Sequence, residues 1–215
     1  MIDNIEVFTH SSIRIKSDAG VIYADPFQIK EDYHDADYVL ITHQHYDHFS
    51  IKDIRKVIKP ETILIVPAKM EDDARELSRE VKEIVALSPN ENRNVAGLEL
   101  EAVPAYNTLK PFHPKRAEWL GYIVITNGKR IYIAGDTGAN KDISKVKCDI
   151  ALLPIGGTYT MDAKRAADLI NTIRPEYAIP THYGNIIGKK TDGKAFAAMV
   201  QSPIKVVEKI QYFKG

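Results

Sequence analysis

The sequence has little cysteine: Cys148 is the only one among 215 residues. A single thiol excludes a disulfide framework within the chain. Cys148 comes just before the apolar segment 149–153, which has the length of a buried strand. We therefore predict that it is a small core residue and not a nucleophile.

Long hydrophobic runs are also missing. No segment approaches the roughly 20 apolar residues that a membrane-spanning helix needs. The first residues, MIDNIE, have neither the cationic start nor the apolar centre of a signal peptide. We therefore expect a cytoplasmic protein that does not bind a membrane.

Neither sign of charge is in excess, because 29 lysines and arginines balance 29 aspartates and glutamates. This balance removes the general electrostatic attraction between basic proteins and nucleic acids, so we expect no nucleic-acid partner. With 44% hydrophobic residues, a chain of this length can bury a sizeable core. We expect a single domain over residues 1–215, and nothing in the sequence specifies its oligomeric state.

Histidine, in contrast, is concentrated in one place. Residues 42–48 read THQHYDH and hold three of the seven histidines. In an extended segment, residues two apart point to the same side, so His43 and His45 can bind one metal ion. Asp47 and His48 follow where the chain turns, so they can face a second ion. Histidines and a carboxylate at this spacing predict a metal site.

The segments on either side of this motif predict a strand and a helix. Residues 37–42, DYVLIT, are rich in β-formers and have the length of a buried strand. Ser50 and Asp53 have the spacing of a capping box, which predicts a helix that starts there and ends before Pro60. The motif therefore lies at the carboxyl end of a strand, where open α/β sheets bind their ligands.

The pattern His-x-His-x-Asp-His after an apolar strand resembles the signature of the metallo-β-lactamase superfamily, mostly hydrolases with one or two metal ions. Residues 135–137, GDT, are similar to the segment with the aspartate that bridges both ions, and residues 180–184, PTHYG, to the segment with the last histidine. The resemblance implies six metal ligands, which are His43, His45, Asp47, His48, Asp136 and His182.

Three further segments are similar to a narrower branch, which contains L-ascorbate-6-phosphate lactonase and related metal-dependent hydrolases. They begin at Thr9-His10, at Asp25-Pro26 and at Pro154, the last reading PIGGTYTM. The resemblance implies that His10 lies beside the metals and takes part in catalysis; the alternative is a structural histidine whose hydrogen bonds are satisfied. For Asp25 two interpretations stand: its carboxylate stabilises the turn, or it is a partner behind a ligating histidine.

One position departs from the superfamily pattern. The third histidine normally follows a strand between the first motif and the bridging aspartate, but here the predicted strand 98–105 is followed by Tyr106 and Asn107. An amide oxygen is a weaker ligand than imidazole for zinc, so Asn107 would leave one site short of a ligand. His113, six residues on, is either the replacement ligand or a residue of a surface loop.

The order of segments also repeats along the chain. The repeat pairs 13–25 with 123–136, 37–41 with 149–153, and 59–67 with 174–180. Each copy reads hairpin, strand, helix, strand, and two copies predict two mixed sheets packed face to face with helices outside. The resemblance implies the same fold, a four-layer αββα sandwich of the α/β class, with the site where the halves meet.

Two segments lie outside the repeat. Apolar residues spaced by three and four predict a helix over residues 69–83. Residues 108–119 lack periodicity and follow the corner where the third ligand is expected. This segment is either a lid or substrate wall, whose Lys110, Lys115 and Arg116 can meet an anionic group, or an ordinary exposed loop.

The implied ligands support hydrolysis, because a divalent ion lowers the pKa of bound water towards about 7. Asp47 would orient the attacking water, and His10 would help to stabilise the developing negative charge. We expect a metal-dependent hydrolase of a small ester, lactone or phosphodiester, with one or two ions of zinc, or of manganese or iron. An iron-dependent redox enzyme, a nuclease of the same fold and a non-catalytic metal-binding protein are the alternatives.

Overall fold

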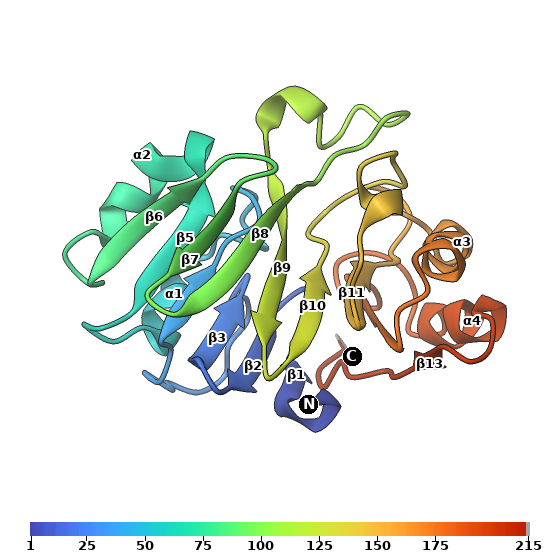
Figure 1. The fold of residues 1–215 in the computed structure, drawn as a ribbon, viewed down its shortest axis with the longest axis horizontal. Helices are drawn as coiled ribbons and strands as arrows, with labels where there is room; N and C mark the ends of the chain where they lie inside the picture. Colours follow the sequence, from blue (N-terminus) through green and yellow to red (C-terminus); the bar gives the residue numbers. More distant parts are fainter. Residues whose placement is uncertain (214–215) are drawn as a thin grey trace.

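Two mixed β-sheets packed face to face form the centre of the protein, in a computed structural model that describes residues 1–213 (Figure 1). The first sheet has the order β1-β2-β3-β4-β5-β6, with strands Ile5–Val7, Ile13–Ser17, Gly20–Ala24, Tyr38–Leu40, Ile63–Pro67 and Glu83–Leu87. The second has the order β13-β12-β11-β10-β9-β8-β7. Its strands β7 to β13 are Asn92–Val95, Leu98–Pro104, Leu120–Thr126, Lys129–Ile133, Ile150–Pro154, Tyr177–Thr181 and Lys205–Val206. Residues 214 and 215 of the predicted domain lie outside the described residues.

Helices lie beside each sheet. The first sheet is accompanied by α1 (Ile51–Val57) and α2 (Glu71–Ala74), and the second by α3 (Ala163–Ile173) and α4 (Asp192–Met199). Five short 3-10 segments complete the described helices: Ile2–Asn4, Ala68–Met70, Arg75–Leu77, Lys115–Ala117 and Ile143–Lys145. The start of α3 is fixed locally, because the side chain of Asp162 accepts a hydrogen bond from the backbone N–H of Arg165 at 2.8 Å.

The buried apolar side chains form three layers. Ile22 and Ala24 of β3 belong to the layer between the sheets, whereas Tyr23 faces the layer under α1 and α2. This alternation follows from the pleat of a strand, which turns successive side chains to opposite faces. A third layer joins the second sheet to α3 and α4. Three apolar layers separate four layers of structure, so the predicted αββα sandwich is confirmed.

The internal duplication is also confirmed. Strands β2 and β3 form an antiparallel hairpin and β3, β4 and β5 run parallel; β9 and β10 form the matching hairpin and β10, β11 and β12 run parallel. The two hairpin turns meet, because Asn127 N–H donates to Asp18 Oδ1 at 3.1 Å. At the opposite end, Leu120 N–H donates to the carbonyl of Thr42 at 3.0 Å. The halves are thus joined at both ends.

Two local predictions were wrong. The segment 69–83 is not one helix: it forms two short 3-10 segments around α2, and Glu83 already starts β6. Pairing of β6 with β5 along five residues outweighs the helical spacing of the apolar side chains. Helix α1 begins after Ser50 as predicted, but Ser50 donates its hydroxyl to Asp53 at 2.7 Å and caps no backbone N–H. Asp53 instead accepts from the backbone of Gln28 and Ile29, each at 3.0 Å.

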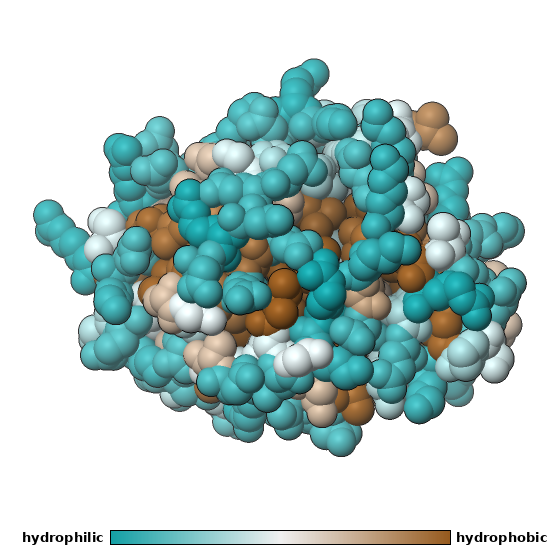
Figure 2. Space-filling view, viewed as in Figure 1, coloured by the Kyte–Doolittle hydropathy of each residue, from teal (hydrophilic) through white to brown (hydrophobic). Residues whose placement is uncertain are grey.

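The face seen in Figure 2 is mostly hydrophilic, with hydrophobic side chains visible in patches between the polar ones. Within residues 1–213, we find no helix with the length and apolar character needed to cross a membrane.

Candidate metal centre

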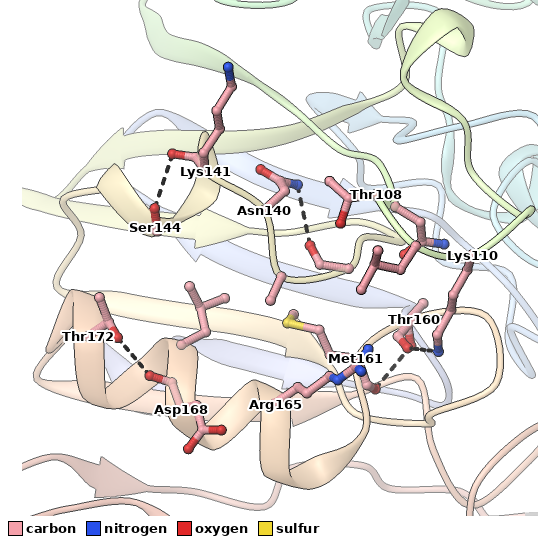
Figure 3. A pocket seen from close by; sticks show the side chains of 15 residues that line it. Thr108, Lys110, Asn140, Lys141, Ser144, Thr160, Met161, Arg165, Asp168 and Thr172 are labelled. Carbon is pink, nitrogen blue, oxygen red and sulfur yellow. Dashed lines mark hydrogen bonds between the residues drawn. The ribbon is translucent and has the colours of Figure 1, made fainter.

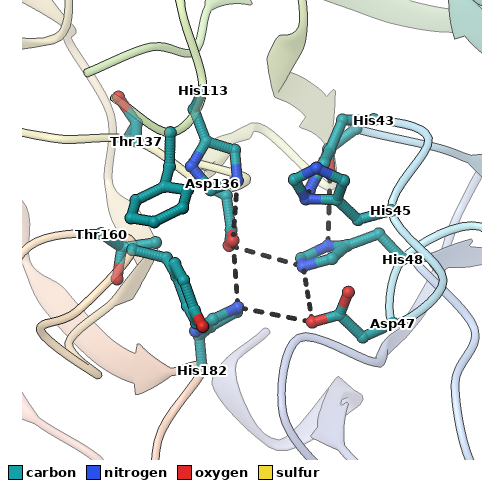
Figure 4. A network of polar contacts seen from close by, with 12 residues as sticks. His43, His45, Asp47, His48, His113, Asp136, Thr137, Thr160 and His182 are labelled. Carbon is teal, nitrogen blue, oxygen red and sulfur yellow. Dashed lines mark hydrogen bonds and ion pairs between the residues drawn. The ribbon is translucent and has the colours of Figure 1, made fainter. Parts of the chain in front are cut away.

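Histidine and aspartate side chains from five loops converge at one end of the two sheets (Figure 4). Four of these loops follow the carboxyl ends of β4, β8, β10 and β12, and the fifth joins β1 to β2. The carboxyl ends of parallel strands lie at a common edge, so residues distant in the sequence meet there. The converging residues are His10, His43, His45, Asp47, His48, His113, Asp136 and His182.

One group of possible ligands contains three histidines. The nearest ligand atoms of His43, His45 and His113 all lie within 4.8 Å of one another. His43 Nε2 is 3.0 Å from His45 Nδ1, as expected for two residues that project to the same side of an extended segment. The ring of Trp119 packs 4.9 Å from the rings of both His43 and His45 and forms one wall of this group.

A second group contains His10, Asp47, His48 and His182, whose ligand atoms also lie within 4.8 Å of one another. Asp136 stands between the two groups. Its Oδ2 is 3.0 Å from His182 Nε2 and 3.3 Å from His113 Nε2. Its Oδ1 is 3.4 Å from His48 Nε2. A carboxylate in contact with both groups can bridge two ions.

The orientation of His48 is fixed from behind by Asp25. His48 Nδ1 lies 2.7 Å from Asp25 Oδ2, and Thr42 donates both its backbone N–H and its hydroxyl to the same carboxylate, at 2.8 and 2.7 Å. Because Nδ1 donates its proton to Asp25, the lone pair of Nε2 points into the cluster. Of the two interpretations of Asp25, the contacts agree with the second: its carboxylate holds a histidine of the cluster from behind. Thr42 was not among the predicted site residues. Its place directly before His43, at the end of the predicted strand 37–42, could have indicated that it supports the site.

The buried atoms of the cluster test whether a metal fits. His48 Nε2, His113 Nε2, His182 Nε2 and Asp136 Oδ1 are buried and have no hydrogen-bond partner among the described residues. Buried polar atoms without partners are costly, by about 1–3 kcal/mol each. Cations bound by the two groups, with Asp136 between them, would satisfy all four atoms, and imidazole and carboxylate are the donors that zinc, manganese and iron accept.

The protonation of two of the histidines, His43 and His10, also suits a metal. Burial, with the charge of His48, holds the pKa of His43 well below its usual value. Burial and His182 lower the pKa of His10 to about 4. These rings are therefore neutral at pH 7, the form that binds a metal.

The two carboxylates are charged. Although burial works against it, the hydrogen bond with His10 and the nearby histidine charges hold the pKa of Asp47 at about 2. Burial likewise opposes ionisation of Asp136, but His182 and His48 keep its pKa well below the usual range. A proton on His48 balances part of this negative charge. Burial lowers the pKa of His48, but Asp136 and Asp25 outweigh this effect and raise the pKa to about 9.

The structure brings His113, and not Asn107, to the metal groups. His113 is buried, and its Nε2 lies 3.3 Å from Asp136 Oδ2. The side-chain amide of Asn107 instead donates to the carbonyls of Phe112 and Tyr159, at 2.7 and 2.8 Å. Its Oδ1 faces Gly138, where a Cβ atom would lie only 2.6 Å away. Asn107, the residue that departs from the superfamily pattern, thus stabilises the loop that carries His113.

The basic residues of the segment 108–119 mostly have protein partners. Lys110 donates to the carbonyls of Gly157, Thr158 and Thr160, the last at 2.5 Å. Lys115 lies 3.3 Å from Asp142. Lys110 also borders a cavity of about 650 Å³ between the loops 107–110 and 138–144 and helix α3 (Figure 3). No member of the histidine and aspartate cluster lines that cavity, so it is a separate feature.

Comparison with known proteins agrees with this geometry. The sequence model of the "Beta-lactamase superfamily domain" matches residues 4–182. The chain belongs to the β-lactamase superfamily. A UPF0173 metal-dependent hydrolase of Pyrococcus abyssi is 33% identical over 183 residues, which are 82% of this chain and 80% of that protein.

Solved structures give the same result. A protein of Parabacteroides distasonis, provisionally described as a metal-dependent hydrolase, is 31% identical, with a TM-score of 0.79 over 96% of this chain and 93% of its own. The metallo hydrolase Igni18 of Ignicoccus hospitalis shares the fold, with 23% identity and a TM-score of 0.73 over 98% of both chains. This member of the superfamily is an enzyme of the metal-dependent hydrolase class.

Proposed function

We propose that the chain hydrolyses a small ester, lactone or phosphodiester at a zinc centre of two ions. The residues that would hold them are His43, His45 and His113 on one side and Asp47, His48 and His182 on the other, with Asp136 between. The four buried lone pairs without partners support this assignment most directly. When bound, the ions supply Lewis acidity, which polarises the substrate oxygen and makes water acidic enough to react near neutral pH.

The residues of the chain prepare the site for this reaction. Asp47 is charged, and its carboxylate can accept a hydrogen bond from the attacking water and orient it. His10 Nε2 lies 3.0 Å from Asp47 Oδ2, so neutral His10 donates to that oxygen and fixes the carboxylate. His10 thus positions Asp47, a different role from direct stabilisation of negative charge on the substrate. The ring of His10 also packs 3.7 Å from that of His182, which limits the movement of both.

Metal analysis and hydrolysis together test the proposal. The chain, purified without chelators, should contain zinc and cleave one of p-nitrophenyl acetate, γ-butyrolactone or bis(p-nitrophenyl) phosphate. Chelation should abolish turnover, and adding back zinc, manganese or iron singly would identify the active metal. Iron-dependent oxygen consumption without hydrolysis would favour the redox alternative instead.

A matched pair of variants ties activity to the cluster. His48→Ala should lose metal and turnover while its far-ultraviolet circular dichroism stays that of the parent chain, because the ligand lies at the end of the sheets. His34→Asn is the control, since His34 contacts only the carbonyl of Ile58 through its ring and lies outside both ligand groups. Full activity in His48→Ala would remove this cluster from the mechanism.

A further inference from the structure

Most of the large hydrophobic side chains that remain exposed lie on loops at the end of the sheets that carries the metal centre. Among residues 1–213 the exposed ones are Tyr46, Leu109, Phe112, Tyr159, Ile186 and Met199. All except Met199 lie on loops that follow β4, β8, β11 or β12, the strands that end at this side of the sheets. Exposed apolar side chains scattered singly need no explanation, but a group of them beside a site marks a surface that binds something.

Three aromatic residues of this group, Tyr46, Phe112 and Tyr159, form what we call the aromatic rim. Tyr46 lies between His45 and Asp47 in the sequence, and Phe112 directly precedes His113. The rings of Phe112 and Tyr159 meet edge to face at 4.8 Å, so the two loops that carry them share one surface. Tyr46 is 68% exposed, and its ring meets that of Phe27 edge to face at 6.1 Å on the loop that carries His45 and Asp47.

Polar contacts to the backbone hold the rim in place. The amide of Asn107 donates to the carbonyls of both Phe112 and Tyr159, at 2.7 and 2.8 Å. Lys110 bonds to the carbonyl of Thr158, next to Tyr159, at 3.0 Å. The ammonium of this lysine is therefore occupied by backbone carbonyls of the loop that carries Tyr159. Lys115 is likewise engaged by Asp142.

We propose that the aromatic rim binds an aryl or similarly large apolar group of an uncharged ester or lactone, next to the bond that is cleaved. The inference rests on the proposed function. It narrows the three proposed substrate classes to two, uncharged carboxylic esters and lactones. Aromatic side chains offer rigid apolar faces with specific edge and face contacts, and such contacts select for ring-bearing ligands. The engagement of Lys110 and Lys115 argues against a phosphate group at this position.

Binding can be measured without turnover. Hydroxamates bind metal centres through their two oxygens, so acetohydroxamate and phenylacetohydroxamate differ only in the group that would reach the rim. Calorimetry on the metal-loaded chain should give a dissociation constant about three- to tenfold lower for the phenyl compound, the range expected for aromatic contacts. In the double variant Phe112→Ala/Tyr159→Ala this preference should vanish, while acetohydroxamate binds as before.

Met199→Ala is the matched control, because Met199 and Tyr159 are each 38% exposed but Met199 lies at the end of α4. It should keep the full preference. Equal affinity for the two hydroxamates in the parent chain would overturn the inference. So would a preference that survives the double variant.

The outcomes also separate this inference from the proposed function. If both hydroxamates bind equally while p-nitrophenyl acetate is cleaved, the hydrolase assignment stands and the rim assignment fails. If neither hydroxamate binds the metal-loaded chain, the metal centre itself is wrong, and the rim proposal falls with it. A higher kcat/KM for p-nitrophenyl phenylacetate than for the acetate, lost in the double variant, would support both.

Discussion

The backbone N–H of Asn107 donates to the carbonyl oxygen of His113 at 2.8 Å. This bond closes a loop of seven residues, 107–113, and returns the chain to the place where β8 ended. The imidazole of His113 can therefore occupy the position expected for a residue directly after the strand. The superfamily's third histidine is thus displaced along the sequence, while its place beside Asp136 is kept.

This relationship predicts opposite results for two substitutions. His113→Ala should lower the zinc content from two ions to one per chain, because only His43 and His45 remain beside Asp136 in the first group. Asn107→His should not raise the metal content, and should lower it, since the new ring cannot bond both Phe112 and Tyr159 and would crowd Gly138. Zinc titration with mass spectrometry of the native protein measures both. A rise to a tighter site in Asn107→His would show that the loop assignment is wrong.

Asp25→Asn should weaken metal binding about 10- to 100-fold, the usual effect of losing a partner behind a ligating histidine. The amide has the size of the carboxylate, but it offers the Nδ1 proton of His48 a neutral oxygen in place of a charged one. Competition with a chromogenic chelator gives the affinity. Asp72→Asn, whose side chain is 85% exposed, is the control and should bind as the parent does. An unchanged affinity in Asp25→Asn would contradict the role assigned to this carboxylate.

His10→Gln should lower kcat about tenfold or more while KM and metal content stay close to the parent values, because the hydrogen bond that orients Asp47 is disturbed. The measurement is steady-state kinetics beside elemental analysis. Loss of an ion would instead make His10 a metal ligand, which its distance of at most 4.8 Å from Asp47, His48 and His182 also permits. The two roles are therefore separated by the metal content alone.

Cys148 should be nearly inert. Burial, with the charge of Asp149, raises the pKa of its thiol to about 12, so the thiolate forms only at high pH. At pH 8 its alkylation by iodoacetamide should be slower than that of a free cysteine by on the order of a thousandfold, and should accelerate as the pH rises. Unfolding in guanidinium should restore the ordinary rate. Fast, stoichiometric alkylation of the folded chain would contradict this burial, and Cys148→Ala should retain activity.

The sequence alone indicated the architecture and every residue of the candidate metal groups, apart from the choice between Asn107 and His113. The short apolar strands and the clustered motif at His43 to His48 are local patterns, because each depends on neighbours a few residues apart. The repeated order of segments then indicated that such local elements are used twice. Local patterns failed where pairing between distant segments competed with them, as in residues 69–83, where the edge strand β6 replaces the end of the predicted helix.

Only the tertiary structure decided between Asn107 and His113. The path of that loop is set by bonds from Asn107 to Tyr159 and from Lys110 to residues 157–160, across about 50 positions of sequence. The same is true of Asp25, which reaches His48 because β3 and β4 run side by side. The residue types that can bind a metal are visible in the sequence. Which lone pairs meet depends on hydrogen bonds between strands and loops that only the folded chain brings together.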